Sequence, residues 1–342
     1  MNSWKSVLSA DPTEWLLEKS NPGVRPLGRS GIRITPVGLG CWQFSQGHGL
    51  NKYWPVLPEA EIDGIVAASV AGGINWFDTA EAYGKGSSER ELSRALQKAG
   101  RPPGSVVVAT KWMPVLRRAS SLGGTIDTRL ACLSPYPIDL YQIHNPLSFS
   151  STAAQMRAMA GLVRAGQTKS VGVSNFGAER MIKAHRSLAE EGLPLASNQV
   201  HYSLLRRKIE VNGVLDAAKD LGITIIAYSP LDQGVLTGRF HDEPSARGAL
   251  SGLRKWRGFY KDRFLERSRP VIEALREVAG RHAATPAQVA INWLFSAHGE
   301  FVVVIPGASK TTQASANAAS MGFVLTADEI DHLDRVSRPF RE

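Results

Sequence analysis

Cysteine is scarce in this sequence, and long apolar runs are missing. Cys41 and Cys132 are the only cysteines, and neither lies in a CxxC motif, so neither a disulfide framework nor a thiolate metal site is indicated. No run of about 18 apolar residues could cross a membrane, and residues 1–20 lack the apolar core and cleavage signature of a signal peptide. We therefore expect a reduced, cytoplasmic protein that is neither exported nor inserted in a membrane.

Two kinds of catalytic motif are also missing. The histidines form neither an HExxH motif nor an HxH pair at the first strand, which disfavours a metal-dependent hydrolase, and we predict no metal site. No GxGxxG motif lies between the first strand and the first helix, which disfavours a dinucleotide-binding open sheet. The hydrophobic content of 43% with 21% charged residues is typical of a globular chain with a sizeable core.

Positive charge exceeds negative charge. The net charge of +9 could favour an anionic partner such as nucleic acid, a membrane or a phosphate-bearing cofactor. Residues 254–269 interleave basic and aromatic residues, a pattern that can bind single-stranded nucleic acid. Because Asp262 and Glu266 interrupt the pattern and a helical period follows, we interpret it as a solvated loop and helix start, with a lid over a bound anion as the alternative. We expect no nucleic-acid or membrane partner.

Short apolar runs alternate with amphipathic segments along the chain. The runs that we predict to be strands are residues 36–42, 74–80, 106–112, 139–145, 170–175, 196–202, 224–230 and 302–308. Strands rich in valine and isoleucine on both faces, each followed by a helix, form parallel sheets covered by helices. Eight such units favour an α/β fold of the closed (β/α)8 type, a TIM barrel, over an open doubly wound sheet.

Helix starts and one long loop complete the predicted organisation. Capping boxes are predicted at Ser88–Glu91, Thr285–Gln288 and Thr326–Glu329. The last of them opens an extra C-terminal helix. Residues 231–262, rich in glycine and charge, form one long loop after the seventh strand. No shift in composition marks a boundary, so we predict a single domain over residues 26–342 with an N-terminal extension over 1–25.

Polar side chains end most of the predicted strands. In strand order they are Asp78, Lys111, His144, Ser174 with Asn175, Gln199, and Tyr228 with Ser229. Taken singly, each has a structural explanation, such as a helix cap, a lysine that reaches solvent or a buried histidine. A barrel brings its strand ends together, however, so these groups and Tyr83 would perturb one another's titration. The sequence therefore predicts an active site there.

These groups could deliver a proton to a substrate. The ammonium of Lys111 would stabilise a phenolate and lower the pKa of Tyr83 from its usual value near 10. A buried Lys111 needs a carboxylate partner, for which Asp78 is suitable, and His144 could donate a hydrogen bond to a substrate oxygen. The set predicts a proton donor for a carbonyl that receives a hydride, which a cofactor must supply. A Schiff-base lyase that uses Lys111 as nucleophile is the alternative.

Seven segments resemble, in the same order, those of the aldo-keto reductase family, including its branch of channel beta subunits. GINWFDTAEAYGKGSSERELSRAL resembles the signature around the catalytic Asp and Tyr of the family. The other segments are VVVATKW, DLYQIHNP, SVGVSNF, ASNQVHYSLL, IAYSPLDQGVLTGRF and VVIPGASKTTQASANAA. The resemblance extends over roughly residues 26–336.

The resemblance implies an NADPH-dependent enzyme that reversibly reduces a small aldehyde or ketone to the alcohol. Tyr83 would be the general acid of a catalytic tetrad with Asp78, Lys111 and His144. The implied cofactor-binding residues are Gly40, Trp42, Asp78, Ser174, Asn175, Gln199, Tyr228, Ser229, Pro230, Leu231, Gln233, Gly234, Arg239, Gly307, Ser309, Lys310, Gln313 and Asn317. The implied substrate pocket is apolar and consists of Trp42, Phe44, Trp54 and Trp112. The resemblance is compatible with a monomer.

Three residues depart from the family pattern. Cys41 replaces a usual threonine, which we expect to be a mild change. Gln313 stands where an arginine often binds the 2′-phosphate, and Ala316 where a glutamate often holds the adenine amino group. Lys310 and Arg239 still favour NADP, with NAD as the alternative. The likeness to channel beta subunits adds a second functional hypothesis, a regulatory subunit that binds the cofactor with little turnover.

Overall fold

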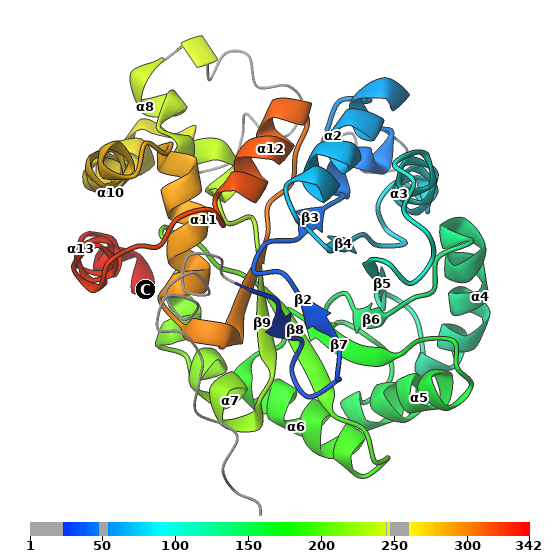
Figure 1. Cartoon of the computed structure of the whole chain (residues 1–342). Helices are drawn as coiled ribbons and strands as arrows, with labels where there is room; N and C mark the ends of the chain where they lie inside the picture. The colour runs from blue at the N-terminus through cyan, green and yellow to red at the C-terminus, as the bar shows by residue number, and fades with distance from the viewer. Residues whose placement is uncertain (1–22, 48–53, 244, 247–259) are drawn as a thin grey trace, which may run out of the picture.

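The structure is a computed structural model that describes residues 23–47, 54–243, 245–246 and 260–342, drawn in colour in Figure 1. Most of the predicted N-terminal extension lies outside the described residues, and so do residues 254–259 of the basic and aromatic segment. The described part of that segment begins the helix α10 (Asp262–Arg281), which agrees with the predicted helix start.

Eight parallel strands form the barrel. They are β3 (Leu39–Gly40), β4 (Trp76–Asp78), β5 (Val107–Trp112), β6 (Leu140–Ile143), β7 (Ser170–Ser174), β8 (Leu195–His201), β9 (Thr224–Tyr228) and β10 (Val302–Ile305). Neighbours in this order pair along the sheet, and parallel bridges from Val37 to Val304 and from Gly40 to Gly307 join the two edges. The predicted (β/α)8 fold is confirmed, although the first strand is shorter than predicted.

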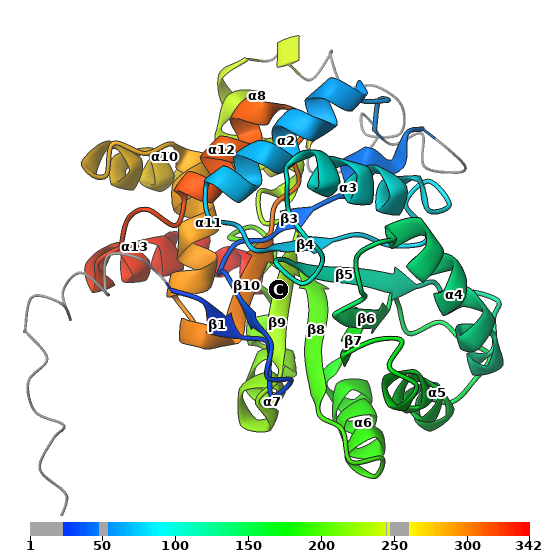
Figure 2. The same cartoon turned by 45° about the vertical axis from the view of Figure 1, so that its right-hand side comes forward.

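Helices surround the barrel, as Figures 1 and 2 show. In chain order they are α2 (Glu59–Ala71), α3 (Ser87–Lys98), α4 (Leu122–Leu133), α5 (Thr152–Arg164), α6 (Ala178–Ala189), α7 (Val214–Leu221), α8 (Arg239–Asp242), α10, α11 (Pro286–Ser296), α12 (Thr311–Ala319) and α13 (Ala327–Ser337). The loop predicted after the seventh strand begins with two short helical segments, η4 (Asp232–Thr237) and α8. The predicted extra C-terminal helix is α13.

A hairpin covers the N-terminal end of the barrel. Its strands are β1 (Arg25–Pro26) and β2 (Arg33–Ile34), which pair antiparallel. Leu27 and Ile34 are buried against interior residues from several strands, and the Gly28 amide donates to Thr224 Oγ1 at 2.7 Å. Because this end is covered, polar chemistry is left to the C-terminal ends of the strands.

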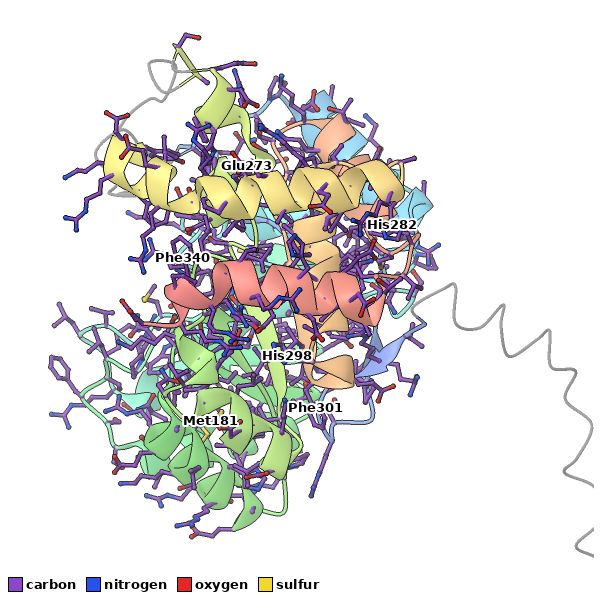
Figure 3. All side chains as sticks on the ribbon, turned by 90° about the vertical axis from the view of Figure 1, so that its left-hand side faces the viewer. Met181, Glu273, His282, His298, Phe301 and Phe340 are labelled. Atoms are coloured by element: carbon purple, nitrogen blue, oxygen red, sulfur yellow. The ribbon has the colours of Figure 1, made fainter. Side chains whose placement is uncertain are left out.

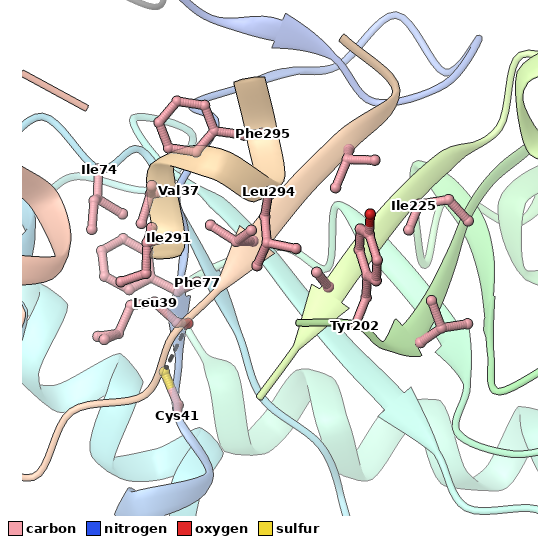
Figure 4. Packing of buried hydrophobic residues seen from close by; sticks show 14 of the residues in the cluster. Val37, Leu39, Cys41, Ile74, Phe77, Tyr202, Ile225, Ile291, Leu294 and Phe295 are labelled. Atoms are coloured by element: carbon pink, nitrogen blue, oxygen red, sulfur yellow. Dashed lines mark hydrogen bonds between the residues drawn. The ribbon is translucent and has the colours of Figure 1, made fainter. Parts of the chain in front are cut away.

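Side chains alternate between the interior of the barrel and the core beneath the helices. Phe77 and Trp112 belong to the core that faces the helices, part of which Figure 4 shows around Val37, Leu39 and Phe77. Asp78 and Lys111, one position away on the same strands, meet inside the barrel. This alternation separates packing residues from candidate catalytic ones.

Two of the three predicted capping boxes are confirmed. Both hydrogen bonds of the box form at Thr285–Gln288 and Thr326–Glu329. The box at Ser88 is wrong, because the helix cap is two residues earlier, at Gly86, whose φ is +88°, and α3 begins at Ser87. Ser88 is buried inside the helix, where its hydroxyl donates to Cys41 O at 2.6 Å and accepts from Thr79. It therefore ties α3 to the start of the site.

The last helices gather on one side of the barrel, where α10, α11 and α13 lie together (Figure 3). A buried arginine, Arg207, fixes α13 to the loop after β8. Its guanidinium donates to Asp334 O at 2.9 Å, to Ser337 Oγ at 2.6 Å and to Glu210 Oε2 at 2.7 Å. The charge of Arg207 is thus fully engaged in holding the C-terminal helix.

Candidate active site

A buried ion pair lies at the centre of the site. The Lys111 ammonium on β5 donates to Asp78 Oδ1 on β4 and, at 2.8 Å, to Thr79 O. Lys111 is 0% exposed and Asp78 is 1% exposed. A charge buried this deeply is tolerated only with a partner of opposite charge, so neither residue could be buried here in its charged form without the other.

Tyr83 lies over this lysine, on the turn that follows β4. Its hydroxyl oxygen is 3.4 Å from Lys111 Nζ, which also lies 4.9 Å from the centre of the phenol ring. The ring packs edge-on against His144 at 5.6 Å and stacks on Trp42 at 6.1 Å. The structure therefore brings together all four residues of the predicted tetrad.

Burial and charge set the titration of these groups. Burial raises the pKa of Tyr83 above its ordinary value, and the Lys111 ammonium opposes that rise without overcoming it, so the predicted lowering is wrong. Burial acts to lower the pKa of Lys111, but Asp78 and Tyr83 raise it above its ordinary value. Such a protonated amine does not suit the nucleophile of a Schiff-base lyase.

His144 is neutral in this site. Burial, aided by the positive charge of Lys111, lowers the pKa of its imidazole to about 3. Its Nδ1 has no hydrogen-bond partner among the described residues. A neutral imidazole beside Tyr83 can contribute a hydrogen bond to a substrate oxygen without adding a second cation to the site.

Two side-chain amides bind the other carboxylate oxygen of Asp78. Gln142 Nε2 lies 3.0 Å from Asp78 Oδ2 and Gln199 Nε2 lies 2.9 Å from it. Gln142 is a site residue that the sequence analysis missed. The signal was present, because Gln142 is two positions before His144 in the predicted strand 139–145, and residues two apart in a strand share a face.

A second hydrogen-bonded group lies beside the tetrad. The Ser174 hydroxyl donates to Gln199 O at 2.9 Å, and Asn175 Nδ2 donates to Ser174 Oγ at 3.0 Å. The Tyr228 hydroxyl donates to Asn175 Oδ1 at 3.0 Å. The ring of His201 stacks on one face of the Tyr228 ring, with the two ring centres 5.2 Å apart. Neighbouring strand ends β7, β8 and β9 thus carry one connected polar surface.

A cleft of about 890 Å³ extends from the tetrad to the N-terminus of α12. Asp78, Tyr83 and His144 line it, and so does every residue that the resemblance assigned to the cofactor, from Gly40 to Asn317. The sequence analysis missed further lining residues, namely Cys41, Gln43, His201, Arg206, Thr237, Phe240, Ala246, Ala287, Ile305 and Pro306. Most of them follow strand ends or belong to the long loop after β9.

Backbone strain is concentrated along this cleft. Asn175, Ser229, Asp232 and Gln233 have φ between +46° and +59°, in the left-handed region that residues other than glycine adopt at a cost of roughly 1 to 3 kcal/mol. Gly234 follows with φ of +96°. The amides of Asp232 and Gly234 donate within this turn, to Ser229 O at 2.9 Å and to Leu231 O at 3.0 Å.

The end of the cleft farthest from the tetrad has more uncharged polar groups than basic groups. Gln313 Oε1 accepts hydrogen bonds from Ser309 N at 2.8 Å and from Ser309 Oγ at 3.2 Å. Arg239 Nε donates to Glu243 at 3.3 Å. Lys310 is exposed and precedes the first turn of α12. Lys310 therefore offers the cation least engaged by acidic neighbours at this end.

Two of the four residues predicted for the apolar pocket line the cleft. Trp42 and Trp54 line the cleft and meet edge to face at 5.7 Å. Phe44 and Trp112 do not line it, because both are 0% exposed and packed in the core beneath the helices. Trp112 faces outward because it follows the inward-facing Lys111 on the same strand.

Cys41 is fully buried, and its thiol lies 3.6 Å from Leu39 O, the contact dashed in Figure 4. Among the described residues, no group of three His, Cys, Asp or Glu side chains could hold a metal ion. None of the described helices is long and apolar enough to cross a membrane.

Comparison with known proteins identifies the family. A model described as "Aldo/keto reductase family" matches residues 36–338. The chain belongs to the aldo/keto reductase family. This aldo/keto reductase is 36% identical over 319 residues to an uncharacterized oxidoreductase of Mycobacterium tuberculosis, covering 90% of this chain and 91% of the relative. It is an oxidoreductase by that membership.

Relatives with a named activity and solved structures have lower sequence identity to this chain. The chloroplastic pyridoxal reductase of Arabidopsis thaliana is 31% identical, with 87% of this chain and 82% of the relative covered. A thermostable aldo-keto reductase solved with the inhibitor epalrestat superposes with a TM-score of 0.72 at 26% identity, over 92% of this chain and 99% of that one. A glycerol dehydrogenase of Gluconobacter oxydans gives a TM-score of 0.77 at 25% identity, over 92% and 94%.

Proposed function

We propose that this aldo/keto reductase reduces an aldehyde or ketone to the alcohol with NADPH, in a reversible reaction. The observation that carries the proposal is the Tyr83 hydroxyl held 3.4 Å from a buried, ion-paired ammonium at the end of a long cleft. Phenol, ammonium and neutral imidazole at one point form a proton donor for an oxygen that becomes negative. No further activity is needed to explain this arrangement.

Each residue of the tetrad has a separate task in this reaction. Tyr83 and His144 orient the carbonyl oxygen between them, and Tyr83 donates its proton to that oxygen as the carbon is reduced. Lys111 stabilises the phenolate that remains on Tyr83, and Asp78 keeps Lys111 charged. A bound nicotinamide cofactor supplies the hydride. Carbonyl, hydride and proton together give the alcohol, and the reverse reaction returns the proton to Tyr83.

The cleft fits a nicotinamide dinucleotide. Amide and hydroxyl groups of Ser174, Asn175 and Gln199 suit a carboxamide, and the Tyr228 ring can stack on the pyridine ring next to it. The cleft wall from Ser229 to Gly234 would border the pyrophosphate, and Lys310 suits a phosphate on the adenosine. Family members typically use NAD(P)H, which also supports the proposal.

The relatives support carbonyl and alcohol substrates. One relative is named for the reduction of pyridoxal, an aromatic aldehyde, and one neighbour in structure for the oxidation of glycerol. The paired rings of Trp42 and Trp54 at the cleft offer planar apolar surface beside Tyr83. We therefore propose that aromatic aldehydes are among the substrates.

A screen of NADPH consumption over aromatic aldehydes, aliphatic aldehydes and cyclic ketones tests the proposed function. We expect turnover with at least one aromatic aldehyde, and the alcohol as product. A tight NADPH complex with negligible turnover over the whole screen would contradict the proposal and favour the regulatory subunit.

We predict that NADPH binds more tightly than NADH, because Lys310 faces the cleft where the adenosine phosphate would lie. Lys310→Met should weaken NADPH binding by up to about fivefold and leave NADH binding unchanged, an effect of at most about 1 kcal/mol for one exposed charge pair. The measurement is a fluorescence titration with both cofactors. Lys183→Met on the exposed surface of α6 is the control; equal affinity of the wild type for both cofactors would refute the role of Lys310.

The pH dependence of reduction follows from the shifted groups. Because the pKa of His144 is lowered to about 3, its imidazole is already neutral in mildly acidic solution. Because the pKa of Tyr83 is raised, its proton is present through neutral pH and is lost only in alkaline solution. We expect kcat to be level from about pH 5 to about pH 9 and to fall only above about pH 10, where the phenol loses its proton. A step in kcat near pH 6.5, the ordinary histidine value, would contradict the assignment of His144.

A further inference from the structure

We propose that Gln142 is a positioning residue for proton transfer: its side-chain amide holds Asp78 in the orientation that pairs with Lys111. The inference rests on the proposed function, because it assigns Gln142 to the same proton donor, Tyr83. Gln142 contacts neither substrate nor cofactor in this account; its Nε2 donates to Asp78 Oδ2, and its Oε1 accepts a longer hydrogen bond from Gln199 Nε2 at 3.4 Å.

The position of Gln142 in the barrel supports this role. Gln142 on β6 is level with Lys111 on β5 and with Gly172 on β7, and it is 0% exposed. Inward-facing polar side chains of a barrel core need a hydrogen-bond partner. The N–H group of the Gln142 amide donates to the carboxylate that the lysine also uses.

Both oxygens of Asp78 are held from different sides. Lys111 binds Oδ1, and the amides of Gln142 and Gln199 reach Oδ2 at 3.0 and 2.9 Å. Gln199 lines the cleft, whereas Gln142 does not. A ligand can therefore compete for the Gln199 side chain, and Gln142 is the donor to Oδ2 that keeps its contact whatever occupies the cleft.

The barrel wall is shaped around Gln142. A Cβ added to Gly172 would lie 2.9 Å from Gln142 Cγ and 2.4 Å from Ser197 Oγ, closer than packed atoms come. Any side chain at position 172 would push Gln142 away from Asp78. Glycine there leaves the space in which the amide can reach the carboxylate.

Loss of the Gln142 amide would affect catalysis through Asp78, Lys111 and Tyr83 in turn. Without the Gln142 amide, Asp78 can turn about its side chain and weaken its contact with Lys111. The ammonium is then no longer held at 3.4 Å from the Tyr83 oxygen. Because small misplacements of catalytic groups cost up to about a hundredfold in rate, kcat should fall while cofactor affinity is preserved.

The first test compares Gln142→Leu with Gln155→Leu. Gln155 is also buried, but it lies on α5 and donates to Ser150 O at 2.9 Å, so the control makes the same chemical change away from the site. For Gln142→Leu we expect kcat to fall by about 10- to 100-fold with the Kd for NADPH within about twofold of the wild type. Gln155→Leu should keep kcat. A kcat for Gln142→Leu equal to that of the control would overturn the proposal.

The second test is the pH profile of Gln142→Glu. A protonated carboxyl at this position can donate to Asp78 Oδ2 as the amide does, whereas an ionised one repels Asp78. We expect kcat near that of the wild type at about pH 5.5 and a loss as pH rises toward about pH 8, over a range in which the wild type stays level. A profile parallel to that of the wild type would contradict the contact between Gln142 and Asp78.

Gly172→Ala, which displaces the amide of Gln142 without removing it, should lower kcat in the same way as Gln142→Leu.

A measurement of thermal unfolding tests this proposal independently of the proposed function. From about pH 5.5 to about pH 8.5 the Tm of Gln142→Glu should fall more than that of Gln155→Glu, because only the first variant places a new carboxylate against Asp78. If the wild type reduces no carbonyl, the proposed function fails and this comparison still tests the contact. Equal falls in Tm would overturn the Gln142 proposal alone.

Discussion

Tyr83→Phe should lose nearly all carbonyl reduction while binding NADPH as the wild type does. The phenol is the only hydroxyl that Lys111 contacts in the structure as described, and general acids contribute about 10²- to 10⁴-fold in rate. We therefore expect kcat to fall by about a thousandfold or more, with no change in the Kd for NADPH measured by fluorescence. The substitution removes one oxygen and keeps the ring that stacks on Trp42.

Tyr141→Phe is the matched control for this experiment. Tyr141 is also fully buried, but it faces the helix-covered core from β6, and its hydroxyl has no hydrogen-bond partner among the described residues. Removing that hydroxyl should leave kcat unchanged. If Tyr83→Phe turned over at a rate comparable to Tyr141→Phe, Tyr83 would not be the acid.

Lys111→Met should lower both activity and stability. The substitution leaves the Asp78 carboxylate buried without its cation, and breaking a buried pair in this way costs about 3 to 5 kcal/mol. The amides of Gln142 and Gln199 still bind Asp78 Oδ2, so we expect a loss near the lower end, measured by urea denaturation. The phenolate of Tyr83 also loses its stabilising charge, so reduction should fall about as far as in Tyr83→Phe.

The double variant Asp78→Asn with Lys111→Met separates the two effects. Removing both charges takes away the unpaired carboxylate, so most of the lost free energy of unfolding should return. Reduction should not return, because no ammonium faces Tyr83. Full stability in Lys111→Met alone would show that the pair is not desolvated, and restored turnover in the double variant would remove Lys111 from the mechanism.

The barrel and the tetrad could be predicted from the sequence because both depend on local pattern. Each buried strand is a short apolar run, and the residue that ends it must lie at the C-terminal rim of the barrel. Asp78 and Lys111 end neighbouring strands, which is sufficient to bring them together. The same pattern applied strictly would have placed Gln142 inside the barrel and Trp112 outside it.

The remaining errors depend on tertiary contacts that no pattern contains. Ser88 has the sequence of a helix cap, but it is drawn into the core by its hydrogen bond to Cys41 O. The sign of the Tyr83 pKa shift depends on the balance of burial and the Lys111 charge, which is decided by packing. Likewise, only the structure shows that Gln313 is engaged by Ser309 and Arg239 by Glu243.

Hydride transfer from the cofactor to the carbonyl is the central claim, and isotope transfer tests it most directly. The measurement uses NADPH with deuterium at both C4 positions of the nicotinamide and an aromatic aldehyde that the wild type turns over, with the product analysed by mass spectrometry. We predict an alcohol that carries one deuterium on the former carbonyl carbon, formed in equal amount to the NADPH consumed. An alcohol without deuterium, or cofactor consumed without alcohol, would contradict the account.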